Sequence, residues 1–180
     1  MAFVRKEVKR VQVNTEFEDL SAPEHLIALA EQKGVDTDPL NVSELAKVLG
    51  IIVRYEPMDS ETSGSLKKEK KTGKWIMKVN SLHHPHRQRF TIAHEIAHRI
   101  RHAANSDDFQ DTTFFRNGDS NWMEAEANNF AATLLMPKDS FENYIANQSS
   151  KVEDIAMHFQ VSSHAVRIRA KALGYDGHNL

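Results

Sequence analysis

The sequence contains no cysteine. This absence excludes disulfide bonds and every metal site built from thiolates. A chain of 180 residues is long enough to bury a hydrophobic core without covalent or metal cross-links. Any metal in this protein must therefore be held by imidazole and carboxylate groups, and we expect it to serve function rather than to hold the fold together.

Long apolar runs and an excess of positive charge are also lacking. No segment approaches the roughly 20 apolar residues of a membrane span, and the opening MAFVRKEVKRVQVN lacks the continuous apolar stretch of a signal peptide. The net charge of −2 argues against a protein that coats nucleic acid by bulk electrostatics. We therefore expect a soluble, cytoplasmic protein that does not associate with membranes.

Hydrophobic spacing divides the first half of the chain into short elements. Residues 22–33 and 42–49 have helical spacing, and each segment is followed by a glycine in the usual position after a helix. The β-branched segment IIVRYEP at 51–57 predicts a strand. Residues 63–80 predict a hairpin, because apolar residues alternate near its end and a Thr-Gly pair marks the turn.

The second half is predominantly helical. A helix is predicted over roughly 86–102, and a second one over 121–136, ending before a proline. Between them, residues 103–121 are polar and acidic without a clear period, which predicts a loop. Residues 138–147 and 151–173 again have helical spacing. The whole pattern predicts an α+β fold with a short antiparallel or mixed sheet packed on helices.

The helix QRFTIAHEIAHRIRH carries a pattern that is typical of metal sites. His94 and His98 lie one turn apart and project in the same direction, so both can reach one ion. Glu95 lies one step round the helix, where it can accept a proton from a water in the same site. This H-E-x-x-H pattern favours a catalytic metal site over the alternative, a surface helix with a histidine pair and a solvated glutamate.

His102 is not expected to be a ligand. It lies about 12 Å from His94 along the axis of a straight helix, which exceeds the span of one coordination sphere. The extended zinc-peptidase motif with a third histidine needs a glycine turn, which this sequence lacks. We expect His102 to be a neighbour of the site or a cation at the end of the helix.

The third ligand must come from another element. On the helix at 121–136, Glu124 and Asn128 share one face, so Glu124 can reach the ion while Asn128 orients a ligand by hydrogen bonding. From spacing alone, two alternatives stay open. Glu124 can instead close a capping box with Asn121, and Glu126, which points about 200° away, is a rival ligand.

The motifs QRFTIAHEIAH and EAEANNFAATLLMP together resemble the ImmA/IrrE family of metallopeptidases. The resemblance covers roughly residues 40–140. It implies a small zincin-like domain, in which the sheet packs on the H-E-x-x-H helix and on a second ligand-bearing helix.

The resemblance also implies roles for individual residues. It makes His94, His98 and Glu124 the ligands of one Zn²⁺ per chain, although these ligands also suit another divalent ion, and it makes Glu95 the general base. It favours Glu124 over its rival because the family's ligand glutamate stands four residues before an asparagine, here Asn128.

The C-terminal segment has a different character. Residues 151–175 have the outline of a helix-turn-helix, and Arg167, Arg169 and Lys171 lie along its second helix. A DNA-binding protein would place such residues against phosphates or base edges. The alternative, which we favour, is a helical pair that docks on the preceding domain.

We therefore expect a metallopeptidase domain at 1–147, with an N-terminal extension at 1–20, and a helical segment at 148–180. The resemblance implies an intracellular zinc endopeptidase that cleaves a specific partner protein, such as a helix-turn-helix repressor or an antitoxin. A strand of the hairpin at 64–80 is a candidate to receive the substrate as an added strand. The alternative function is a non-catalytic, metal-stabilised DNA-binding regulator or a pseudo-enzyme that binds a partner.

Overall fold

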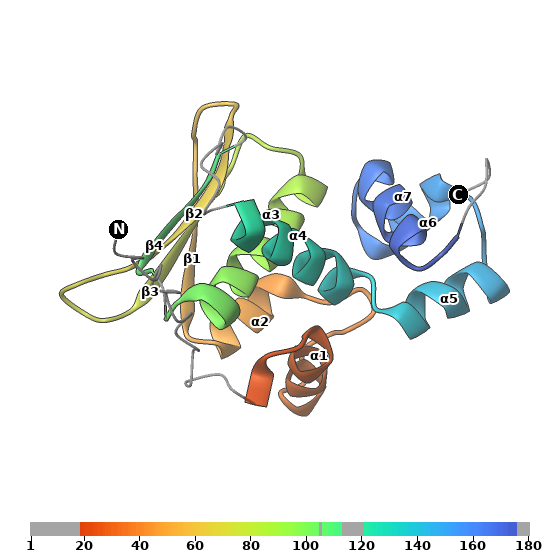
Figure 1. The fold of residues 1–180 in the computed structure, drawn as a ribbon, viewed down its shortest axis with the longest axis horizontal. Helices are drawn as coiled ribbons and strands as arrows, with labels where there is room; N and C mark the ends of the chain where they lie inside the picture. The colour runs from red at the N-terminus through yellow and green to blue at the C-terminus, as the bar shows by residue number, and fades with distance from the viewer. Residues whose placement is uncertain (1–18, 105, 113–120, 176–180) are drawn as a thin grey trace, which may run out of the picture.

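The computed structural model describes residues 19–104, 106–112 and 121–175. It confirms the α+β fold: helices α2 and α3 cover one face of a small sheet, α4 packs on α3, and α1 packs on α4 and α2. Helices α5 to α7 lie farthest from that sheet (Figure 1). The N-terminal extension expected at 1–20 lies outside the described residues except for its last two. No helix in the described part of the chain is long and apolar enough to cross a membrane.

The sheet is mixed, with the strand order β1-β3-β2-β4. The predicted hairpin is present: β2 and β3 pair antiparallel, and Gly73 takes the left-handed conformation, with φ of 69°, in the turn between them. β1 pairs with β3 in parallel, and β4 pairs with β2 antiparallel. The strands are β1 (Ile51–Glu56), β2 (Thr62–Lys68), β3 (Trp75–Asn80) and β4 (Asp108–Thr112).

Strand β4 lies within the segment that was expected to be a loop. Its sequence lacks an apolar alternation, but it pairs with β2, and Phe109 opposite Leu66 is buried at 8% exposure. This segment is a strand because it pairs with β2, and not because its own sequence alternates apolar and polar residues. Because β2 and β3 each have neighbours on both sides, the expectation that a hairpin strand offers a free edge to substrate is wrong.

Helix α3 (Pro85–Ala97) packs against β2 and β3 and continues into a π-helical turn, η2 (His98–His102). The helix comes so close to β2 that a Cβ on Gly64 would lie 2.6 Å from Thr91 Cγ2 and 2.7 Å from the Lys78 carbonyl oxygen. Only glycine allows this approach. Helices α1 (Pro23–Gln32), α2 (Val42–Val48) and α4 (Asn121–Leu135) complete the layer.

The C-terminal helices pack on the end of this layer through α7 and α4. They are α5 (Lys138–Asn147), α6 (Val152–Phe159) and α7 (Ser163–Ala172), and α6 and α7 form the predicted helix-turn-helix. Arg169 of α7 is buried and donates hydrogen bonds to the Met136 carbonyl at 2.9 Å and to Thr133 Oγ1 at 3.1 Å. Arg169 therefore anchors α7 to the end of α4 and does not face DNA, whereas Arg167 is exposed.

Candidate metal centre

Two helices bring three potential ligands together. His94 stands near the end of α3 and His98 begins η2, while Glu124 comes from the first turn of α4. Helices α3 and α4 pack closely because the α4 side chains between them are small: Ala127 and Ala131 are fully buried. The small alanine side chains of α4 thus let the two helices come close enough for the three candidate ligands to meet.

The ligand atoms of this group converge. His94 Nε2 lies 3.0 Å from His98 Nε2 and 3.1 Å from Glu124 Oε2, and His98 Nε2 lies 3.2 Å from Glu124 Oε1. The two histidine side chains are almost fully buried, whereas Glu124 is 27% exposed. Among the described residues, this group has the composition and spacing to hold one metal ion, with access from the glutamate side.

The protonation of these groups suits a cation. Burial lowers the pKa of His98 to about 4, against the opposing effect of Glu124. Burial by itself raises the pKa of Glu124, but its contacts with His94 and His98 outweigh burial and hold that pKa at about 2. His94 Nδ1 lies 3.0 Å from Asn128 Oδ1, so the imidazole donates there and leaves its Nε2 lone pair facing the group.

Metal binding requires the form in which both imidazoles are neutral and carry their hydrogen on Nδ1, so that two bare Nε2 atoms and one carboxylate surround the same point. Their electron pairs face one another at 3.0–3.2 Å, which is unfavourable unless a cation lies between them. Two nitrogen donors and one oxygen donor are a ligand set of catalytic zinc sites. The residues therefore fit a bound zinc ion, and Asn128 contacts the candidate ligand His94 by a hydrogen bond of the kind that orients metal-binding histidines.

Glu95 lies beside this group and not within it. The side chain is fully buried, and its Oε1 is 3.7 Å from the position that a Cβ on Gly64 would occupy. Glu95 therefore sits between α3 and β2, and the close approach of these two elements encloses it. Its carboxylate is not one of the three converging ligand groups.

Two other predicted neighbours have different outcomes. Glu126 points away from the converging atoms and binds Arg101 and His102, with the shortest distances 2.7 and 2.8 Å. His102 is fully buried, and burial lowers its pKa, so it is a neutral neighbour and the expectation of a helix-terminal cation is wrong. The side chain of Asn121 lies outside the described part, so the capping-box alternative stays untested, but the Glu124 carboxylate contacts the histidines.

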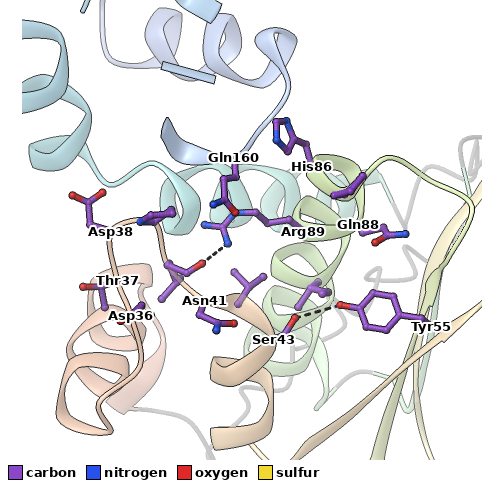
Figure 2. Close-up of a pocket in the computed structure, with 15 residues that line it drawn as sticks. Asp36, Thr37, Asp38, Asn41, Ser43, Tyr55, His86, Gln88, Arg89 and Gln160 are labelled. Atoms are coloured by element: carbon purple, nitrogen blue, oxygen red, sulfur yellow. Dashed lines mark hydrogen bonds between the residues drawn. The ribbon is translucent and has the colours of Figure 1, made fainter. Parts of the chain in front are cut away.

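A separate cavity of about 600 Å³ lies near the other end of α3 and does not contain the candidate ligands. Figure 2 shows Arg89 in this cavity, between the loop of residues 36–41 and Gln160. Arg89 donates to the carbonyls of Leu40 and Phe159, so it joins α3 to the loop before α2 and to the end of α6. Burial lowers the pKa of Arg89 to about 10, which leaves it charged at neutral pH.

The fold is zincin-like: the H-E-x-x-H helix packs on a small sheet and carries two members of the histidine–glutamate group. A family model described as the IrrE N-terminal-like domain, Peptidase_M78, matches residues 46–171. The chain belongs to this family, which confirms the resemblance to ImmA/IrrE proteins. The matched region extends well into the C-terminal helices.

Comparisons with individual proteins add the fold alone. A search of curated proteins gives no match. Among solved structures, the chain is similar to one named "Mycobacterium tuberculosis transcriptional regulator", with a TM-score of 0.58 and 19% sequence identity. The alignment covers 91% of this chain and 52% of that one, so the chain spans about half the length of that regulator.

Proposed function

We propose that the protein is a zinc-dependent endopeptidase that cleaves a specific partner protein. The observation that carries this proposal is the convergence of His94, His98 and Glu124 beside the buried Glu95. A purely structural metal site has no use for a carboxylate at the general-base position of the motif. Membership of a peptidase family supports the same reading.

The side chains divide the work of peptide hydrolysis. His94, His98 and Glu124 would hold the ion, which when bound supplies Lewis-acid chemistry that polarises a carbonyl and makes water more acidic. Glu95 accepts a proton from the attacking water and then delivers it to the leaving amine. Its enclosed position between α3 and β2 removes bulk water from its surroundings, which favours proton transfer.

The proposed substrate is a helix-turn-helix repressor or an antitoxin. Two observations support this choice: the resemblance to ImmA/IrrE proteins, which are associated with regulatory proteolysis, and the similar fold of a chain named as a transcriptional regulator. We expect cleavage at one site in that partner and little action on unfolded protein in general. Selectivity of this kind protects the cell that makes the enzyme.

Co-expression with candidate repressors tests the proposal. Mass spectrometry of the fragments should show one defined cut with the wild-type enzyme and no cut with Glu95→Gln. The Gln variant should still bind zinc, because the ligands are unchanged, so metal content serves as the control. Equal fragments with both proteins, or rapid and indiscriminate degradation of casein, would contradict the proposal.

A second candidate function is a metal-stabilised DNA-binding regulator. The helix-turn-helix shape of α6 and α7 and the exposed Arg167 and Lys171 favour it. The burial of Arg169 against α4 counts against it, because one of the three basic residues serves packing. Sequence-specific binding of a DNA duplex that disappears in an Arg167→Ala, Lys171→Ala variant would favour this function over proteolysis.

A further inference from the structure

A line of hydrogen bonds leads outward from His98, away from the converging ligand atoms. His98 Nδ1 lies 2.9 Å from His102 Nδ1, and His102 Nε2 lies 2.8 Å from Glu126 Oε2. The other carboxylate oxygen, Oε1, lies 2.7 Å from Arg101 Nη2 and 3.0 Å from Arg101 Nε. Since His98 and His102 are both buried, their contact is not a solvated pair on the helix surface.

The Glu126 carboxylate, at the outer end of this line, determines which atom donates each hydrogen bond. A carboxylate only accepts hydrogen bonds, so His102 donates through Nε2 to Glu126. A neutral His102 then has a lone pair at Nδ1 and accepts the hydrogen of His98 Nδ1. His98 is thereby left with a bare Nε2, which is the atom that faces His94 and Glu124.

Aromatic side chains hold the two rings in place. The ring of Phe109, from β4, stacks on His98 with centroids 4.7 Å apart and planes inclined by 19°. Trp122 meets His102 edge-on, with centroids 5.4 Å apart. The rings of His98 and His102 are 5.0 Å apart within the π-helical turn. The line of hydrogen bonds is therefore built into the packing of η2, β4 and α4.

We propose that His102 and Glu126 are positioning residues that fix the tautomer of the metal ligand His98. Metal-binding histidines commonly donate their other nitrogen directly to a carboxylate. Here a second imidazole lies between the carboxylate and the ligand and transmits the same constraint. This inference rests on metal binding by His94, His98 and Glu124, which the proposed function also needs, but it does not require peptide hydrolysis.

Glu126→Gln is the most informative variant. Arg101 has only donors, so it attracts the amide oxygen and turns the amide NH₂ toward His102 Nε2. His102 must then accept at Nε2 and carry its hydrogen on Nδ1. His98 Nδ1 becomes the acceptor, and the hydrogen of His98 moves to Nε2, where it blocks the ligand atom.

Zinc affinity of the metal-free full-length chain, measured by competition with a chelator, tests the inference. We expect Glu126→Gln and His102→Phe to weaken binding by about 10–100-fold. His102→Asn keeps an acceptor near the position of Nδ1 and should recover most of the affinity. Glu44→Gln, which alters an exposed ion pair on α2, is the matched control and should bind zinc like the wild type.

Nitrogen-15 NMR of the metal-free proteins gives a second readout that a loss of packing would not mimic. The wild type should show His98 protonated at Nδ1, and Glu126→Gln should show it protonated at Nε2. Wild-type affinity together with an unchanged tautomer in Glu126→Gln would overturn the inference. If Glu126→Gln shows the weaker zinc affinity and the changed tautomer, but the wild-type protein cleaves no candidate substrate, the proposed peptidase is refuted and the inference stands.

Discussion

Each ligand of the candidate metal centre is oriented by a different neighbour. Asn128 accepts from His94, and His102 lies against the outer nitrogen of His98. The Glu124 side chain is 27% exposed, so a substrate can approach the group from its side. The three donors are thus fixed unequally, with the histidines rigid and the glutamate more accessible.

At this scale we predict the metal content of single variants. Purified protein should carry about one zinc ion per chain, and His98→Ala and Glu124→Ala should lose it, because two protein ligands hold zinc poorly. Glu126→Ala should keep the full stoichiometry at saturating zinc. Elemental analysis after equilibrium dialysis against saturating zinc measures these values.

His164→Ala, which removes an exposed histidine of α7, is the control for non-specific loss. Full occupancy in Glu124→Ala with loss in Glu126→Ala would show that the wrong glutamate has been assigned. Full occupancy in a His94→Ala, His98→Ala double variant would refute the site altogether.

Among the elements, the contact between α3 and β2 sets how Glu95 is enclosed. The strand passes the helix at a distance that leaves no space for a side chain at Gly64. Two of the atoms that a Cβ would meet are Thr91 Cγ2 and a backbone oxygen of β3, and the latter cannot move without displacing the strand. The position of Glu95, the proposed general base, is therefore set by the close packing of two elements.

Gly64→Ala should separate α3 from β2. We expect a loss of about 1–3 kcal/mol in the free energy of unfolding, as for other overpacked cores, and a fall in any peptidase activity beyond that in zinc content. Urea denaturation and metal analysis measure the two effects. Ser65→Ala, one residue along the same strand, is the control, and a stability of Gly64→Ala equal to that of the control would contradict this account.

The contact between α7 and α4 gives a second test of an element. Arg169→Ala removes the donors to the Met136 carbonyl and to Thr133 and leaves buried acceptors unsatisfied. We expect a cost of about 1–3 kcal/mol in the free energy of unfolding and faster proteolysis of the C-terminal helices.

Arg167→Ala is the matched control because Arg167 is exposed two residues away. It should change the free energy of unfolding by less than about 0.5 kcal/mol. Equal effects of the two substitutions, measured by urea denaturation and by mass spectrometry after limited proteolysis, would show that Arg169 does not anchor α7.

For the whole molecule, a continuous hydrophobic core connects α1, the sheet, α3, α4 and the C-terminal helices. This core does not depend on a cross-link, since the chain has no cysteine. The candidate metal centre lies within the fold, and the hydrophobic core is continuous without it. We therefore expect the protein to stay folded when the metal is removed.

Removal of the metal by a chelator should leave the circular dichroism spectrum at 25 °C unchanged. It should lower the melting temperature, because zinc at 100 to 1,000 times its Kd adds about 2.7–4.1 kcal/mol of stability. The Glu124→Ala variant, treated in the same way, should show no change in melting temperature. Loss of the helical spectrum on chelation would show instead that the metal holds the fold together.

The sequence by itself determined most elements and the nature of the site. Helical and alternating patterns located the helices, the hairpin and the helix-turn-helix, because a side chain's neighbours along one element follow from the period of that element. The spacing of His94 and His98 fixed their common direction in the same way. The absence of cysteine limited the ligands to imidazole and carboxylate.

Only the tertiary structure decided what depends on contacts between elements. The segment around Phe109 becomes a strand through pairing with β2, and that pairing removes the free edge of the hairpin. Arg169 and Arg167 are alike in sequence, but only Arg169 meets α4. The sequence left His102 either as a neighbour of the site or as a cation at the end of the helix. Packing by α4 and β4 buries it, and because an uncompensated charge is costly in a buried position, His102 is a neutral neighbour.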